Sequence, residues 1–265
     1  MKKAIQNSAL LAYRIARKIG ILSTPVGQRL SHHAYFMFKR LFEPNIVHLR
    51  SLVTPRSLVI DVGAHVGFYT RMFAAWVSDG GRVLAIEPAP ANADALRDTV
   101  ARWCPGQVDV LVAAASEVDG SLLLQLNPQS SADNRLAETG LPVRSVTIDG
   151  LLRDRGWPVV SFVKIDVQGA EPRVLAGARE MIARFHPAIL IEIDDDALAT
   201  TGSSAHELIS NLNCAGYTMY GVEPSAQRVR MSTKEAECRR RELGYADFLF
   251  VWTPACQNVM SGLTQ

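Results

Sequence analysis

Cysteine is scarce in this sequence, and its spacing excludes two kinds of site. The 265 residues include four cysteines, Cys104, Cys214, Cys238 and Cys256. No two of them have the Cys-x-x-Cys spacing of a zinc or redox site. Thiols so far apart do not form the framework of a small secreted scaffold, and they favour a reducing compartment. We therefore expect a cytoplasmic protein whose cysteines are buried or incidental.

Acidic residues are absent from residues 1–42, which hold eight Lys and Arg. The rest of the chain contains the other 20 basic residues and all 26 acidic ones, so its net charge is −6. Apolar residues at near-helical spacing, such as Ile15 and Ile19, predict a helix in this basic arm. The helix could lie on the inner face of an anionic membrane, pack on the body of the protein or bind a partner. The overall charge of +2 gives no reason to expect a nucleic-acid partner.

Apolar runs long enough to cross a bilayer, which takes about 20 residues, are also missing. The run at residues 4–13 is interrupted by Asn7 and Ser8, and no small-residue cleavage site follows it. A membrane span and a signal peptide are therefore not expected. Internal repeats are absent as well, which excludes solenoid folds.

From Ser57 onward, predicted strands and helices alternate. Buried runs of β-branched residues predict a mainly parallel sheet with helices on both faces, the doubly wound α/β class. The two last strands lie close together in the sequence and predict an antiparallel hairpin at the sheet edge. Strands are expected at 57–62, 82–86, 108–115, 121–126, 143–148, 160–166, 187–193, 217–222 and 247–252, and helices at 65–77, 92–103, 171–185 and 205–215. The predicted organisation is an N-terminal helical extension over 1–52, an α/β domain over 53–254 and a tail over 255–265.

A strand, a small-residue turn and a helix follow one another over residues 59–70. Gly63 permits backbone angles that other residues avoid. Ala64 and Gly67 leave the turn bare, so a ligand can approach the main chain. Asp61 stands at the strand end, where its carboxylate could accept a hydrogen bond from an amine.

A second acidic residue, Glu87, ends the next strand 20 residues after Gly67, and Pro88 then redirects the chain. A carboxylate at this position can accept hydrogen bonds from both hydroxyls of a ribose. The two signals together predict a nucleoside pocket. The alternative is a glycine turn that serves helix packing alone.

The missing third glycine distinguishes between nucleoside cofactors. A dinucleotide site takes Gly-x-Gly-x-x-Gly, whereas this turn has Gly63-x-x-x-Gly67. The carboxylate of Asp61 would repel a pyrophosphate and attract the ammonium group of a methionine moiety. These residues favour S-adenosylmethionine over NAD. Two other functions stay open: an NAD-dependent oxidoreductase or epimerase acting on nucleotide sugars, and a nucleoside-binding module without catalysis.

Seven further features, read in order along the chain, are Asp61-Val62-Gly63-Ala64-x-x-Gly67-x-Tyr69-Thr70, Glu87-Pro88, Thr147-Ile148-Asp149, Val163-Lys164-Ile165-Asp166-Val167-Gln168-Gly169-Ala170-Glu171, Val174-Leu175-x-Gly177-Ala178, Leu190-Ile191-Glu192 and Asp247-Phe248-Leu249-Phe250. Together they resemble the FkbM family of S-adenosylmethionine-dependent O-methyltransferases, over about residues 42–252. The resemblance implies a class I methyltransferase fold, which is Rossmann-like. The expected cofactor contacts are Asp61, Gly63, Ala64, His65, Gly67, Tyr69, Thr70, Glu87, Pro88, Ala114 and Asp166.

Two residues depart from the pattern of that family. His65 stands where Asn is frequent, and Gln168 stands where Glu is frequent. The second difference removes a negative charge beside the expected active site. It argues against a catalytic or metal-binding role for this position.

Methyl transfer requires an acceptor oxygen held near the sulfonium methyl and a group that helps the hydroxyl lose its proton. Lys164 and Asp166 are two residues apart on one strand, so their side chains point to the same side. Glu192 supplies a carboxylate across the crevice, and these three residues are the predicted catalytic set. For Lys164 the alternative is an internal ion pair that only joins two strands. Asp166 and Glu192 could hold Mg²⁺, but no third ligand is evident, so no metal site is expected.

The polar loop at residues 130–135 suits a polyhydroxylated acceptor, although a plain surface turn fits it equally. By resemblance to the family, we expect methyl transfer to a hydroxyl of a sugar, a glycoconjugate or a glycolipid. A polyketide-type natural product is the second choice.

Overall fold

The computed structural model describes residues 36–37, 39, 46–127, 130–222 and 228–253. The chain divides into two compact units, 1–45 and 46–265, and the elements below belong to the second. The expected helix of the basic arm and the tail over 255–265 lie outside the described residues. Within the described ranges, no helix is both long enough and apolar enough to cross a membrane.

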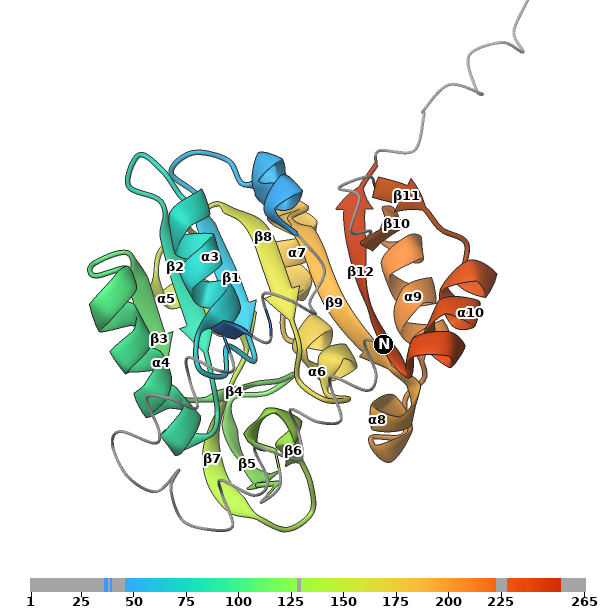
Figure 1. The fold of residues 1–265 in the computed structure, drawn as a ribbon, viewed down its shortest axis with the longest axis horizontal. Coiled ribbons are helices and arrows are strands. Elements are labelled where there is room, and N and C mark those ends of the chain that lie inside the picture. Colours follow the sequence, from blue (N-terminus) through green and yellow to red (C-terminus); the bar gives the residue numbers. More distant parts are fainter. Residues whose placement is uncertain (1–35, 38, 40–45, 128–129, 223–227, 254–265) are drawn as a thin grey trace, which may run out of the picture. The chain divides into compact units, whose positions relative to one another are not determined.

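One sheet contains eight strands in the order β11-β10-β12-β9-β8-β1-β2-β3 (Figure 1). Their bounds are β1 Leu58–Val62, β2 Arg82–Ile86, β3 Val108–Leu111, β8 Val160–Ile165, β9 Ala188–Asp194, β10 Tyr217–Val222, β11 Arg228–Arg230 and β12 Tyr245–Trp252. The five strands from β9 to β3 pair in parallel, which confirms the doubly wound α/β class. The strand order reverses between β1 and β8, so the carboxyl ends of these two strands flank the expected ligand crevice.

The C-terminal part of the sheet differs in detail from the predicted hairpin. β10 and β12 pair antiparallel, as expected, but β12 lies inside the sheet, between β9 and β10. The segment that joins them forms β11 at the sheet edge and then helix α10, Thr233–Leu243. Ser232 and Glu235 form a capping box at the start of α10. The helix is mostly polar, so the sequence lacks the apolar period that would have predicted it.

Helices cover both faces of the sheet. One face packs Val59, Phe162 and Leu190 against α3, Phe68–Trp76, and against the 3-10 helix η2, Val47–Leu52. Phe73 of α3 contacts the ring of Phe162 with centroids 5.5 Å apart, a packing arrangement that aromatic pairs favour. Helix α4, Pro90–Trp103, contacts β3. The other face is covered by α5, Ile148–Asp154; α6, Glu171–Ala176; α7, Arg179–Phe185; α8, Asp195–Thr200; α9, Ala205–Cys214; and α10.

The single helix predicted over 171–185 is wrong, because the chain breaks between α6 and α7 at Gly177. A Cβ atom at Gly177 would collide with the carbonyl oxygen of Ser116. A new helix then begins, and the carboxylate of Asp149 accepts hydrogen bonds from the backbone N–H groups of Glu180 and Met181, both at 2.9 Å. The break is therefore fixed by contacts that are distant in the sequence.

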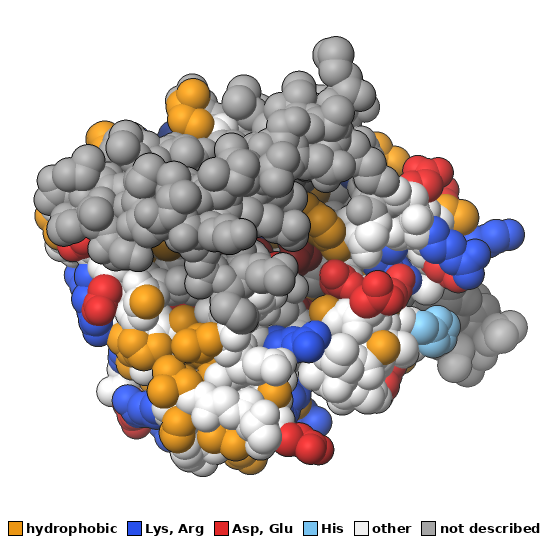
Figure 2. All heavy atoms as spheres, turned by 60° about the horizontal axis from the view of Figure 1, so that its bottom comes forward, with side chains coloured by type: hydrophobic (Ala, Val, Ile, Leu, Met, Phe, Trp, Pro, Cys, Tyr) orange, Lys and Arg blue, Asp and Glu red, His pale blue; other side chains and the backbone are white. Residues whose placement is uncertain are grey.

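A small second sheet is inserted between β3 and β8, in the order β4-β7-β5-β6. Its strands are β4 Ala114–Ala115, β5 Gly120–Gln125, β6 Arg135–Leu136 and β7 Leu141–Val146. The strand predicted over 108–115 is thus two strands in different sheets, and the one predicted over 143–148 ends at Val146 because Thr147 caps α5. Figure 1 draws this sheet beyond the carboxyl ends of β1 and β2. In Figure 2 hydrophobic side chains gather over it, and Leu126 and Leu141 are exposed.

Candidate active site

Asp61, on β1, is buried with one carboxylate oxygen unused by the described residues. Thr70 of α3 donates a hydrogen bond to Asp61 Oδ2 at 2.6 Å, whereas Asp61 Oδ1 has no hydrogen-bond partner among the residues described. Burial raises the pKa of Asp61 to about 6, against the opposing effects of Lys164 and Thr70. A buried, unpaired carboxylate oxygen is costly and calls for a donor. Thr70, itself fully buried, positions this carboxylate.

The turn after β1 is shaped by two glycines with positive φ, Gly63 at +80° and Gly67 at +91°. A Cβ atom on Gly63 would collide with the carbonyl oxygen of Asp166, and one on Gly67 would lie 2.8 Å from Leu96 Cδ1. The protein's own packing therefore requires both glycines. Their contact with a cofactor stays a prediction, while the buried Ala64 lies between them in the same turn.

His65 holds the turn in place from a left-handed backbone conformation, with φ at 51°. Asn and His adopt this conformation more readily than most residues, which accounts for His at a position where Asn is frequent. The His65 backbone N–H donates to Glu87 Oε2 at 2.9 Å, and its ring Nε2 lies 2.9 Å from Ser131 Oγ. His65 therefore connects β1, the end of β2 and the loop of the small sheet.

Glu87, at the end of β2, is buried and accepts three hydrogen bonds. The donors are the backbone N–H groups of His65 and Ala89 and the side-chain amide of Asn92, at 2.9, 3.0 and 3.2 Å. Burial raises the pKa of Glu87, and these three donors oppose the shift. The donors fix the carboxylate at the carboxyl edge of the sheet. Asn92 also donates to the carbonyl oxygen of Ser131 at 3.1 Å, and sequence reasoning missed this residue.

Lys164 is the centre of an acidic cluster on one face of the sheet. Its side chain is 1% exposed, and its Nζ lies 2.7 Å from Asp166 Oδ2 and 4.5 Å from the centre of the Tyr69 ring. Burial acts to lower the pKa of Lys164, but four carboxylates outweigh it and raise the pKa above its usual range. The four are Asp166, Asp247, Asp61 and Glu192, in order of effect. The surrounding carboxylates therefore favour the protonated form of Lys164.

Asp247 belongs to this cluster, and sequence reasoning gave it no role. It lies on β12 directly opposite Glu192 of β9 in the antiparallel register, and it is 7% exposed. In the same way, Asp61 of β1 is the register partner of Lys164 on β8. Placing β12 beside β9 would have revealed Asp247, but that placement depends on the topology of the whole sheet.

Gln168 joins Asp166 and Glu192. Its Nε2 donates to Glu192 Oε1 at 3.2 Å and to Asp166 Oδ1 at 3.4 Å. Both carboxylates of the predicted catalytic set therefore accept from one neutral amide.

Glu171 supports the loop that carries Gln168. Its Oε1 accepts from the backbone N–H groups of Val167 and Gly169, both at 3.2 Å. Burial raises the pKa of Glu171 to about 7, against these backbone donors. Glu171 thus holds the loop through Oε1, while its buried Oε2 has no hydrogen-bond partner among the described residues.

The remaining predicted cofactor residues lie near the carboxyl edge of the sheet, and their surroundings differ. Tyr69 faces Lys164, as described above. Pro88 follows Glu87 and is half-buried. Ala114, in β4, is buried with Ala89, Leu124 and Val143, so it joins the small sheet to the end of β2.

The acidic edge fits S-adenosylmethionine. This cofactor carries a sulfonium and an ammonium against one carboxylate, so it is a net cation. One buried Lys among four carboxylates leaves an excess of negative charge among the described residues. Asp61 Oδ1, which has no hydrogen-bond partner among them, could accept a hydrogen bond from the ligand. A pyrophosphate would be repelled by the same charges. No group of three or more His, Cys, Asp or Glu in the described ranges could hold a metal ion.

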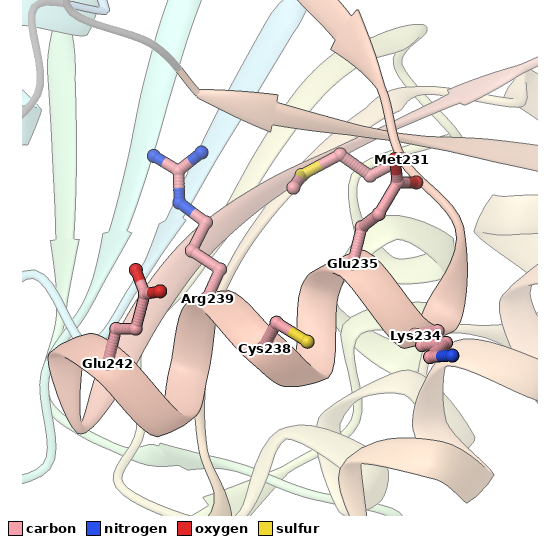
Figure 3. A pocket seen from close by; sticks show the side chains of 6 residues that line it. All are labelled: Met231, Lys234, Glu235, Cys238, Arg239 and Glu242. Atoms are coloured by element: carbon pink, nitrogen blue, oxygen red, sulfur yellow. The ribbon is translucent and has the colours of Figure 1, made fainter.

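A separate groove lies on α10 and the end of β11, lined by Met231, Lys234, Glu235, Cys238, Arg239 and Glu242 (Figure 3). It shares no residue with the strand ends described above. Apart from Met231, its lining comes from α10, and it contains none of the predicted site residues.

Comparisons with known proteins identify the family of this chain. A family model described as the methyltransferase FkbM domain matches residues 61–219, more than half of the chain. The 31-O-demethyl-FK506 methyltransferase FkbM of Streptomyces tacrolimicus is 27% identical over 213 residues, covering 62% of this chain and 81% of that protein. The hexuronic acid methyltransferase AglP of Haloferax volcanii is 27% identical over 135 residues, covering 50% of this chain and 54% of that protein.

Among solved structures, methyltransferase FkbM from Methylobacillus flagellatus KT is similar, with a TM-score of 0.48 and 18% identity. The match covers 76% of this chain, which spans 44% of that protein. The matched family segment contains Asp61, Glu87 and Lys164 together with both glycines of the turn. The chain therefore belongs to the methyltransferase FkbM domain family, whose members are S-adenosylmethionine-dependent methyltransferases.

Proposed function

We propose that this protein transfers a methyl group from S-adenosylmethionine to a hydroxyl of a sugar, a glycoconjugate or a related natural product. The observation that carries the proposal is the acidic cluster at the strand-order reversal, with Asp61 Oδ1 buried and without a partner in the described residues. Bound there, S-adenosylmethionine would supply an electrophilic methyl group. The protein's residues have to bind it, exclude water and assist loss of the acceptor proton.

Two residues would hold the ends of the cofactor. Asp61 would accept a hydrogen bond from the ammonium group, and Glu87 would accept from the ribose hydroxyls. Thr70 fixes Asp61, while His65 and Asn92 fix Glu87. Because these carboxylates are held before any ligand arrives, little ordering entropy remains to oppose binding.

The acceptor proton would pass to a carboxylate. The surrounding carboxylates favour the protonated form of Lys164, so we assign it no role in accepting this proton. Asp166 and Glu192 lie at the ends of β8 and β9, joined by Gln168. Lys164 instead holds Asp166 ionised through the contact at 2.7 Å. This assignment changes the role that the sequence favoured for Lys164 from chemistry to electrostatic support.

Two relatives support a natural-product or sugar acceptor, since they are named as methyltransferases of 31-O-demethyl-FK506 and of a hexuronic acid. The insert from β4 to β7 lies at the same edge and would form the acceptor side of the crevice. Mg²⁺ is not part of the proposal.

A screen of acceptors tests the function. The purified protein would be incubated with S-adenosylmethionine and panels of sugars, glycolipids and polyketides, and products read by mass spectrometry. A gain of one methyl group on a hydroxyl, lost in Asp61→Ala, supports the proposal. Turnover of NAD with a nucleotide sugar in place of methyl transfer would support the oxidoreductase and contradict it.

The basic arm at residues 1–42 would bring a lipid-linked acceptor close, through attraction to anionic headgroups. Co-sedimentation of the full chain with vesicles containing anionic lipid tests this idea. We expect binding that weakens with salt and is lost when Arg14, Arg17 and Lys18 are replaced by Glu. Absence of binding at low salt would remove the membrane proposal.

A further inference from the structure

The side-chain amide of Gln168 lies between two carboxylates from different strands. It donates to Glu192 of β9 at 3.2 Å and to Asp166, at the end of β8, at 3.4 Å. The second oxygen of Asp166 accepts from Lys164 at 2.7 Å. Asp166 thus receives a cation on one side and a neutral donor on the other.

The backbone at Gln168 is strained, with φ at 54°, a left-handed conformation that a residue with a side chain seldom adopts. Its surroundings hold it there. Glu171 accepts from both neighbouring N–H groups, and Thr201 Oγ1 donates to the carbonyl oxygen of Gly169 at 2.8 Å. A Cβ atom on Gly169 would collide with the carbonyl oxygen of Ala197. Strain that several contacts maintain at an active edge points to a function for the side chain that it directs.

The charged groups around this amide explain why a neutral donor is favourable at this position. Lys164, Asp61 and Asp247 act on the cluster from β8, β1 and β12, and Glu171 acts on Asp166 from α6. Apart from Lys164, these neighbours are carboxylates, which disfavour a further negative charge. A neutral donor between Asp166 and Glu192 stabilises both charges without adding one.

We propose that Gln168 is a positioning residue of this site: its amide holds Asp166 and Glu192 side by side in their ionised forms, ready for the acceptor hydroxyl. The expected effect on catalysis rests on the proposed function. The effect of Gln168 on the ionisation of the two carboxylates does not depend on it. Gln168 is the only residue in the described ranges whose hydrogen bonds to both carboxylates are seen.

The experiment follows the carboxylates directly by ¹³C NMR titration, with the signals assigned through Asp166→Asn and Glu192→Gln. Gln168→Ala removes the donor, and Gln168→Glu replaces it with a third carboxylate of the same shape. We expect the ionisation midpoint of Glu192 to rise by about one pH unit in the first variant and further in the second. Gln107→Glu, the same chemical change at an exposed residue before β3, should leave the midpoint unchanged.

Kinetics give a second readout. If the proposed function holds, both Gln168 variants should lower kcat at neutral pH, move the acidic limb of its pH profile upward and spare the Kd for S-adenosylmethionine measured by calorimetry. Unchanged NMR midpoints in both variants overturn the role of Gln168, whether or not the protein methylates anything. Shifted midpoints in a protein that binds no S-adenosylmethionine would overturn the proposed function and leave the electrostatic role standing.

Discussion

Asp61 is the residue on which the proposed cofactor recognition depends, and its ionisation has a cost in the folded protein. The pKa of Asp61 rises from 3.8 to about 6, because burial opposes the charge. The folded state therefore binds this proton more tightly than the unfolded chain does. The stability that Asp61 contributes is present below pH 3.8 and is lost as the pH rises through about 6.

Asp61→Asn keeps the shape and removes the charge. At pH 8 we expect the free variant to be more stable than the wild type by about 2 kcal/mol, and to bind S-adenosylmethionine at least about tenfold more weakly. Urea unfolding at pH 5 and pH 8, with calorimetry at pH 8, measures both effects. A variant less stable than the wild type at pH 8 would show that Asp61 supports the fold rather than the ligand.

His65 offers a second test at the same scale, because its backbone and ring act separately. His65→Asn retains a residue suited to φ of 51° and removes the ring contact to Ser131. We expect stability within about 1 kcal/mol of the wild type, with faster amide hydrogen exchange in residues 130–134. Ser131→Ala should reproduce the faster exchange, and equal protection in all three proteins would contradict a structural link between the turn and the loop.

At the scale of elements, the β1–α3 turn can lie against the end of β8 because residue 63 is glycine and has no side chain. Gly63→Ala places a Cβ atom against the carbonyl oxygen of Asp166 at a φ of +80°. The expected loss of stability is about 3 kcal/mol or more, from strain and overpacking together.

Gly80 provides a matched control, because its φ is +88° and no atom lies within 4 Å of an added Cβ. Gly80→Ala should lose only about 1 kcal/mol, the backbone strain alone. Denaturant midpoints of the two variants compare these effects. Equal losses would mean that the contact with Asp166 relaxes freely.

Elements with a local signal were predicted well from the sequence, and those fixed by distant contacts were not. β2 was predicted at its observed bounds from its apolar run. The break at Gly177 depends on Ser116 and Asp149, and no local pattern reveals it. Helix α10 begins with a Ser-x-x-Glu pattern at Ser232, but its mostly polar sequence lacks the apolar period that predicts a helix.

The candidate site follows the same rule. Asp61, Glu87, Asp166 and Glu192 were found because they end predicted strands. Asp247 appeared in a family motif but was given no role in the site, since it reaches the site only because β12 inserts between β9 and β10.

At the scale of the whole molecule, the two halves of the doubly wound sheet contribute different chemistry. β1 and β2 supply Asp61 and Glu87, which are proposed to hold the two ends of the cofactor, while β8, β9 and β12 supply Lys164 and the other carboxylates around it. The sheet reverses its strand order between these halves, so a single cationic nucleoside ligand could contact both.

Isothermal titration of the full chain with S-adenosylmethionine, S-adenosylhomocysteine and NAD, at pH values on both sides of 6, tests this account most directly. It predicts one site for each sulfur cofactor, no heat with NAD, and affinity for S-adenosylmethionine that strengthens as Asp61 ionises through about pH 6. Binding of NAD, or no binding of either sulfur cofactor at any pH, would contradict it.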